Sequence, residues 1–220
     1  MKQHSLFDII SPVMIGPSSS HMAGAIRLGL MAGKIYSSTI KKVTFKLYNS
    51  FAETGKGHGT DKGLMAGLIG LSADDIRVRT VFDLEEVKKI DYKYEFSHNL
   101  DRHPNAVDFI INDETVISGN STGGGNIEIT KINEFETSIS GEYPTIIVFY
   151  KDKPGMISRV TELILEKHIN VATLNCTRNA KGETASMCIC LDSPAENGVA
   201  EKISALEDVY FVRNIDKMDS

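Results

Sequence analysis

The 220-residue sequence has no apolar run close to the roughly 20 residues that a membrane-spanning helix needs. Its first ten residues, MKQHSLFDII, lack both the basic segment and the extended apolar segment of a secretory signal. Basic residues are in the minority, with 24 Lys and Arg against 29 Asp and Glu, and neither sign forms a long block. We therefore expect a soluble, cytoplasmic protein that binds neither nucleic acid nor membrane.

Cysteine is scarce, and its spacing excludes a disulfide framework. The three residues Cys176, Cys188 and Cys190 all lie in the last quarter of the chain, which suits a reducing compartment. Three thiols could hold a cluster, but SMCICL alternates cysteine with apolar residues and contains no C-x-x-C. We interpret the thiols as small core residues and expect no metal site in this chain.

The remaining composition is that of a folded protein with one large or two small domains, since 41% of the residues are hydrophobic. A polar, irregular segment, KINEFETSISGEYP, divides the chain. We expect one domain over residues 1–131, a linker over 132–143 and a second domain over 144–220. In the second domain the pattern predicts a β-α-β-β-α-β order, with strands at TIIVFY, NVATLNCTRN, ETASMCICLD and VYFVRNI and helices over 155–168 and 194–206.

The first domain is predicted to be an α+β, sandwich-like layer in which two helices cover one face of a sheet. The helices are expected over residues 22–37 and 61–71, and the strands at VTFKLYN, IRVRTVF, YKYEF, AVDFIIN and TVISGNS. Four short motifs interrupt this pattern: GPSSSH (16–21), TGKGHGTD (54–61), HPN (103–105) and STGGGN (121–126).

Two of these motifs are placed where helices are expected to begin. Ser18, Ser19 and Ser20 can provide a helix cap, while the remaining hydroxyls and free N–H groups form a seat for a carboxylate or phosphate. His58 lies between two glycines, so a ligand can approach its ring closely. Asp61 can cap the following helix or orient an imidazole.

Three of the six histidines, His21, His58 and His103, fall inside the motifs. Together they indicate a small, polar pocket that transfers protons. Metal ligation by the same imidazoles is the rival interpretation, and the absence of His-x-His and His-x-x-x-His pairs counts against it. STGGGN lacks the Lys-Ser or Lys-Thr of a phosphate loop, so Gly123 and Gly124 are more consistent with close backbone packing around a small ligand.

The second domain resembles the ACT domain, a small-molecule sensor at the ends of amino-acid enzymes. Its best local marker is the loop DKPGM, residues 152–156, after the first strand. The resemblance implies a ferredoxin-like fold and self-association through this domain. It also implies a regulatory loop, containing Asp152, Pro154 and Gly155, that meets an amino acid at the paired interface. Dimerisation without any ligand is the alternative.

GPSSSH with the upstream SLFDIISPVMI, then TGKGHGTD, HPN and the triple glycine ahead of an ACT domain, closely resembles the beta chain of bacterial iron-sulfur-dependent L-serine dehydratase. The resemblance implies one half of a lyase that converts L-serine to pyruvate and ammonia. An alpha-chain partner would ligate the 4Fe-4S cluster. The family usually has Thr after the GPSSSH histidine; Met22 stands there in this chain, so no hydroxyl contact is expected from that position.

The resemblance also implies roles for individual residues. His58 is the candidate base for the α-proton, and His103, oriented by Asn105, would hydrogen-bond or protonate the leaving hydroxyl; sequence does not fix the order of these two roles. Ser18, Ser19 and Ser20 would hold the carboxylate, with His21 assisting or relaying a proton. Further substrate contacts are expected from these residues: Thr60, Asp61, Asn105, Gly123 and Gly124.

A second hypothesis is a purely regulatory chain. The first domain also resembles the allosteric substrate-binding domain found beside an ACT domain in some phosphoglycerate dehydrogenases. A sensor needs hydroxyl and N–H groups but no titrating base, so the three motif histidines favour the catalytic interpretation.

Overall fold

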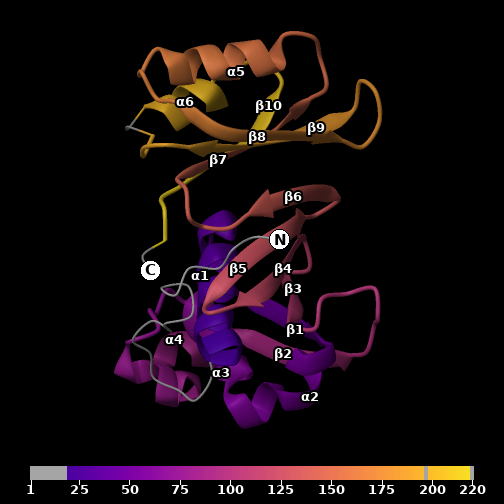
Figure 1. Cartoon of the computed structure of the whole chain (residues 1–220), viewed down its shortest axis with the longest axis vertical. Helices are drawn as coiled ribbons and strands as arrows, with labels where there is room; N and C mark the ends of the chain where they lie inside the picture. The colour runs from indigo at the N-terminus through magenta and orange to yellow at the C-terminus, as the bar shows by residue number, and fades with distance from the viewer. Residues whose placement is uncertain (1–18, 196–197, 219–220) are drawn as a thin grey trace. The chain divides into compact units, whose positions relative to one another are not determined.

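The computed structural model describes residues 19–195 and 198–218, without the side chains of residues 19, 20, 54, 56 and 57. The chain forms two compact units, Met1–Asn133 and Glu134–Ser220 (Figure 1). In the described part, no helix is both long enough and apolar enough to cross a membrane.

The first unit is an α+β layer built on strands β1 to β5 in the order β2-β1-β3-β4-β5. Only the β1–β2 pair is parallel. The strands are β1 (Lys42–Tyr48), β2 (Asp91–Ser97), β3 (Ala106–Ile111), β4 (Thr115–Gly123) and β5 (Asn126–Ile132). The helical segments are a π-helical turn (Ser19–Ala23), α1 (Gly24–Tyr36), α2 (Asn49–His58), α3 (Thr60–Leu68), a 3-10 helix (Ile76–Asp83) and α4 (Glu85–Lys88).

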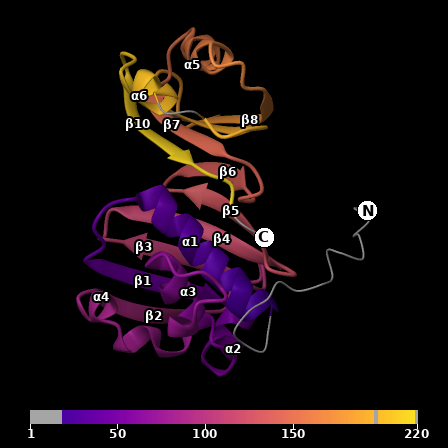
Figure 2. The ribbon, with the colours of Figure 1, turned by 90° about the vertical axis from the view of Figure 1, so that its left-hand side faces the viewer.

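Helices α1 and α3 pack against each other on one face of this sheet, as expected (Figure 2). Glycines let the two helix backbones touch. A Cβ atom built on Gly67 would collide with the carbonyl oxygen of Ile26, and one on Gly29 would collide with that of Leu64. Beneath the helices, the rings of Phe45 and Phe109 are fully buried. The ends of α1 and α3 are therefore fixed relative to the sheet.

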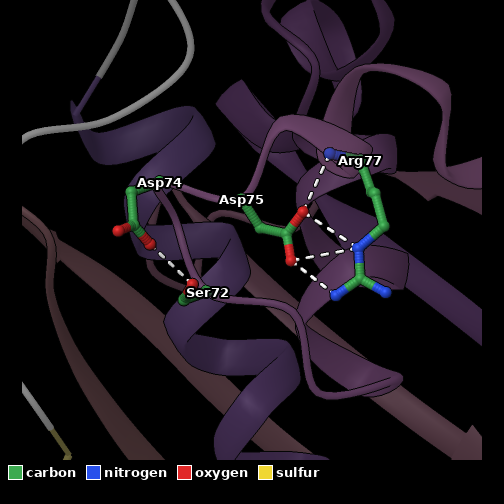
Figure 3. Close-up of polar contacts among 4 residues, drawn as sticks. All are labelled: Ser72, Asp74, Asp75 and Arg77. Atoms are coloured by element: carbon green, nitrogen blue, oxygen red, sulfur yellow. Dashed lines mark hydrogen bonds and ion pairs between the residues drawn. The ribbon is translucent and has the colours of Figure 1, made fainter.

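The strand expected at IRVRTVF is wrong, because these residues form the 3-10 helix. Val78 and Val81, three apart, are its buried side chains, whereas Ile76 is 61% exposed. The buried side chains are therefore three apart and not two apart as in a strand, with a kink at Thr80 between them. Asp75 caps the helix, its Oδ1 accepting from the Arg77 N–H at 2.9 Å while its carboxylate pairs with the Arg77 guanidinium (Figure 3).

The second unit has the expected ferredoxin-like order. It contains β7 (Thr145–Lys151), α5 (Met156–Leu165), β8 (Val171–Arg178), β9 (Thr184–Leu191), α6 (Val199–Ser204) and β10 (Val209–Ile215). The sheet order is β10-β7-β9-β8, with every pair antiparallel. Both helices pack on one face, where Val160 and Ile203 meet the inward residues of β7 and β9.

Residues 132–143, expected to be a linker, contain a further strand, β6 (Phe135–Ile139). It lies in the second compact unit and contacts β8 and β9. The Phe135 ring lies 5.2 Å from that of Phe149. The polar residues that made this segment look like a linker alternate with buried Phe135 and Ile139, so the segment covers the sheet face opposite α5 and α6.

Cys188 and Cys190 are buried on that opposite face, 4% and 8% exposed. The Cys190 thiol lies 3.7 Å from the Thr145 hydroxyl within the same sheet. Cys176 is exposed on the edge strand β8. The two buried thiols have the environment of core residues, whereas Cys176 does not, so the core interpretation is wrong for that one cysteine.

Candidate active site

The described residues of the four sequence motifs lie at one end of the first sheet. Strand pairing places the end of β1, the start of β3 and the end of β4 side by side, through Leu47 opposite Val107 and Ala106 opposite Asn120. The HPN motif precedes β3, and STGGGN forms the end of β4 and its turn into β5. Helix α2 leaves from the end of β1 and carries TGKGH.

His21 and His58 form an edge-to-face pair, with ring centroids 5.0 Å apart. The His21 Nε2 atom lies 3.3 Å from the Ser50 hydroxyl, and its ring lies 5.5 Å from that of Phe51. Burial, followed by the nearby His58 ring, lowers the pKa of His21 below its ordinary value. His21 is therefore mainly neutral at pH 7.

His58 lies ahead of a helix, as the sequence suggested, and it also ends a helix that the sequence did not predict. It is the last residue of α2, and Gly59, with φ +77°, turns the chain into α3. The helix escaped prediction because Gly55 and Gly57 are poor helix formers, whereas burial of Phe51 holds the segment to the core. The His58 side chain remains exposed, which leaves it accessible to a substrate.

Met22 stands beside this pair. A Cβ atom built on Gly59 would lie 2.5 Å from the Met22 Cε atom, so the methionine side chain packs against the Gly59 backbone. Met22 is 8% exposed. Met22 is therefore a packing residue that contacts the backbone directly after His58.

His103 is held by its own motif. The backbone N–H of Asn105 donates to the His103 Nδ1 atom at 3.1 Å, so the neutral ring carries its proton on Nε2. Asn105 thus orients His103, as the sequence suggested, and it does so through its backbone N–H. Burial lowers the pKa of His103, and the Glu128 carboxylate opposes this more weakly.

Two buried polar atoms at this end of the sheet have no hydrogen-bond partner among the described residues. They are the Oδ1 atom of Asn105 and the hydroxyl of Thr60, a residue that is fully buried. The Asn105 carbonyl, by contrast, accepts from the Ser121 N–H at 3.0 Å, which joins HPN to STGGGN. Buried polar atoms are nearly always satisfied, so these two are candidate ligand contacts.

The other expected contacts are placed as follows. Ser18 lies outside the described residues. Ser19 and Ser20 form the π-helical turn itself and do not precede the helix. Gly59, not Asp61, occupies the N-cap position of α3; the Asp61 carboxylate accepts from the Lys62 N–H at 2.8 Å.

The β4–β5 turn requires glycine. Gly123, Gly124 and Gly125 have φ of +103°, +61° and +85°, and a Cβ atom on Gly123 would meet open space. Three successive positive φ values account for the triple glycine by conformation alone. The hydrogen bond from the Ser121 N–H to the Asn105 carbonyl places this turn near Asn105. This proximity supports a ligand contact at the turn.

Sequence reasoning missed a group of charged and aromatic residues under the HPN loop. The Tyr48 hydroxyl donates to Asp108 at 2.7 Å, and the Arg102 guanidinium pairs with the same carboxylate at 2.5 Å. The guanidinium also lies 4.3 Å from the centre of the Tyr48 ring. Burial and the Asp108 bond raise the pKa of Tyr48 to about 12, so its hydroxyl stays protonated and keeps donating.

The regulatory loop expected in the second unit borders an open depression of about 480 Å³. Its lining includes Asp152, Pro154 and Gly155. Gly155, with φ +87°, is the N-cap of α5, and a Cβ atom there would meet open space. The Asp152 carboxylate is already engaged by the Gly182 N–H and by Arg178, both at 3.1 Å, and these contacts lower its pKa.

No cluster of three or more His, Cys, Asp or Glu side chains suited to a metal ion occurs within residues 19–195 and 198–218. Cys188 and Cys190 lie in a packed strand, where the neighbouring backbone has no turn that could fold around a cluster. The described thiols therefore do not fit an iron-sulfur cluster.

Comparison with known proteins gives a consistent result. A family model described as serine dehydratase beta chain matches residues 5–131, and one described as an AHAS small subunit-like ACT domain matches residues 146–211. The chain is 39% identical to the probable L-serine dehydratase, beta chain, of Bacillus subtilis (strain 168), over 98% of this chain and 99% of that protein.

Two further relatives show how far the similarity extends. The L-serine dehydratase, beta chain, of Peptoniphilus asaccharolyticus is 34% identical over 94% of this chain and 96% of its own length. D-3-phosphoglycerate dehydrogenase of Synechocystis sp. is 25% identical over 44% of this chain and only 18% of that protein.

Proposed function

We propose, because this chain belongs to the serine dehydratase beta chain family, that it is the beta subunit of a two-chain L-serine dehydratase. In this proposal the subunit supplies acid–base residues to an active site shared with an alpha chain. The observation that carries it is the exposed His58 ring paired with a neutral His21 at the meeting point of the four motifs.

The reaction requires three things of the protein. A base must take the α-proton of serine, an acid must assist departure of the β-hydroxyl, and a seat must hold the carboxylate and amino groups. Loss of the α-proton and the hydroxyl as water leaves an enamine, which tautomerises and hydrolyses to pyruvate and ammonia.

His58 is the proposed base. Imidazole exchanges protons near neutral pH, and the exposed position of His58 leaves it open to a substrate bound at the end of the sheet. The neighbouring His21 has a lowered pKa, so a proton received by His58 meets an uncharged ring. The Ser50 contact holds the His21 ring edge-on to His58.

His103 is the proposed hydrogen-bond donor to the leaving hydroxyl. Its Nδ1 atom is occupied as an acceptor, so Nε2 carries the proton and can donate it. The lowered pKa keeps this ring neutral, so it stabilises the leaving oxygen by a hydrogen bond and does not transfer a proton to it.

The ammonium and carboxylate groups of serine can bind the polar atoms that have no partner among the described residues. The Asn105 Oδ1 atom lacks a donor among the described residues, which suits the ammonium group of serine. The Thr60 hydroxyl, fully buried and without a partner there, can contact the carboxylate. Ser19 and Ser20 lie in the π-helical turn before α1, and backbone N–H groups at the start of a helix can bind an anion. Ser18, Asp61, Gly123 and Gly124 remain proposed contacts.

We assign the 4Fe-4S cluster to the alpha chain, where it would supply the Lewis acid for the departing hydroxyl. The proposal is supported by the poor fit of the described thiols to a cluster. The contribution of this chain is therefore confined to binding serine, orienting it and moving protons.

The ACT domain is proposed to mediate self-association. Seating of an amino-acid effector at Asp152, Pro154 and Gly155 is the alternative role of its loop. The depression beside the loop and the open space over Gly155 support access for a ligand, whereas the prior engagement of Asp152 leaves backbone groups as the main contacts.

Anaerobic co-expression with the alpha chain, followed by a pyruvate assay on L-serine, tests the proposed function. We expect turnover by the complex and none by either chain alone. A complex that assembles with its cluster but leaves serine unchanged would contradict it and favour a purely regulatory chain.

A further inference from the structure

The corner between β1 and α2 touches two parts of the proposed site, the His21 ring and the HPN segment. Asn49, directly after the last residue of β1, has φ +50°, a left-handed conformation that Asn adopts more readily than most residues. Ser50 follows with its hydroxyl beside the His21 ring. The Phe51 N–H donates to the Pro104 carbonyl at 3.3 Å, one residue after His103.

The Asn49 side chain binds the backbone of the loop over residues 99–103. Its Nδ2 atom donates to the carbonyls of Asn99 at 2.8 Å, Arg102 at 3.1 Å and His103 at 3.4 Å. Its Oδ1 atom accepts from the Asn99 N–H at 2.9 Å. One amide group thus joins both ends of the loop to the end of β1.

Apart from Asn49, this loop is fixed by polar contacts: within it, the Asp101 N–H donates to the Asn99 Oδ1 atom at 2.9 Å and the Arg102 N–H donates to the Asn99 carbonyl at 3.1 Å. Leu100 at its tip is 99% exposed, and Asp101 beside it is exposed as well. Arg102 is held from the other side by Asp108. A loop with so few buried apolar contacts depends on its hydrogen bonds for a single conformation.

We infer that Asn49 is a positioning residue of the active site, fixing the loop that carries His103 at the end of the sheet where His21 and His58 pair. The inference rests on the proposed function for its catalytic consequence. Its structural part, that the Asn49 amide determines the setting of His103, stands independently of the reaction.

Asn112 offers a matched control in the same unit. It too has a positive φ, +51°, and its Oδ1 atom accepts from the N–H groups of Lys41 and Lys42, both at 2.9 Å. Its Nδ2 atom donates to the Tyr36 hydroxyl and the Thr39 carbonyl. Asn112 lies at the opposite end of β1, away from the histidines.

The variants are Asn49→Gly and Asn112→Gly. Glycine tolerates the positive φ, so each change removes the side-chain bonds without straining the backbone. Asn49→Asp is the second variant, because it keeps the acceptor for the Asn99 N–H but replaces the donor with a carboxylate oxygen facing three carbonyls.

The first measurement is an NMR titration of the histidine rings in the full-length chain. Burial lowers the pKa of His103, and the Glu128 carboxylate raises it by a smaller amount. If the loop is freed, exposure of His103 to solvent therefore raises its pKa by more than separation from Glu128 lowers it. We expect the His103 pKa to move up towards the ordinary value of about 6.5 in Asn49→Gly and to stay unchanged in Asn112→Gly. If the pKa of His103 is the same in both Asn49 variants as in the wild type, the inference is overturned.

The second measurement is serine turnover by the complex. A catalytic group displaced by about 1 Å costs up to about 100-fold, so we expect kcat of Asn49→Gly to fall about 10- to 100-fold with KM within about twofold. Asn112→Gly should keep the wild-type kcat. An equal loss in both variants, or no loss in the Asn49 variants, refutes the positioning role. An inactive wild-type complex refutes the proposed function instead, and the NMR result then decides the structural part.

Discussion

The close approach of α1 and α3 makes Gly67 the most sensitive glycine of the first unit. A Cβ atom there would collide with the Ile26 carbonyl oxygen and lie 2.7 Å from the Leu30 nitrogen. Both are backbone atoms, which cannot rotate away. Gly67→Ala therefore forces the helices apart, and these helices begin next to His21 and His58.

The expected magnitude follows from two opposing effects. Alanine in a helix interior is favoured over glycine by up to about 1 kcal/mol. Overpacking a well-packed core typically costs about 1–3 kcal/mol, and rigid backbone contacts put this site at or above the upper end. We predict a net loss of about 1–3 kcal/mol in the free energy of unfolding.

Urea unfolding followed by far-UV circular dichroism measures this loss. With a slope of about 1–3 kcal/mol per molar urea, the midpoint should drop by about 1 M. Gly55→Ala is the control, because its Cβ atom would meet the end of the Leu47 side chain at 3.2 Å, which can shift, and the Thr60 Cβ atom at an ordinary contact distance of 3.9 Å. A Gly67→Ala protein as stable as wild type would refute the backbone contact between α1 and α3.

Three further predictions concern acid stability, the cluster and the ACT loop. Burial lowers the pKa values of His21 and His103, so the unfolded chain binds protons first as the pH falls; stability should therefore decline from about pH 7 to 5, and a His21→Asn variant should decline less. The isolated chain, purified without oxygen, should show no iron-sulfur absorbance, and a stoichiometric cluster on it would contradict our assignment of the cluster to the partner. Gly155→Val fills the space over the loop and strains its positive φ, so it should change the rate-versus-serine curve if an effector binds there; identical curves at identical assembly would leave the domain a dimerisation module.

Much of the architecture was predictable because burial follows simple periods. The ACT-like order and four of the five strands expected in the first domain are present. IRVRTVF misled because Ile76 and Val78 alternate as in a strand, whereas Val81 sets the actual period of three. Helix α2 and strands β5 and β6 were not predicted; for α2 and β6, tertiary contacts of Phe51 and Phe135 override local sequences rich in glycine or polar residues.

Of the three histidines of the candidate site, the structure brings His21 and His58 together, and their catalytic roles remain predictions. Ser50 and Asn49 were not found, because serine and asparagine after a strand are ordinary turn residues and their partners lie 29 and 50 or more positions away in the sequence. A tyrosine followed by Asn-Ser at the end of a strand does not by itself indicate a functional site.

The central claim is that this chain contributes the base of a shared active site, and replacing His58 tests it most directly. His58→Ala and the control His98→Ala, an exposed histidine paired with Glu53 at 2.8 Å, would each be assembled anaerobically with the alpha chain. Pyruvate formation from L-serine and cluster absorbance are then measured on the same samples. We predict that His58→Ala lowers kcat by about two to four powers of ten with the cluster absorbance unchanged, and that His98→Ala keeps the wild-type rate. A His58→Ala complex that turns over serine at the wild-type rate, or a His98→Ala complex that loses as much, would contradict the claim.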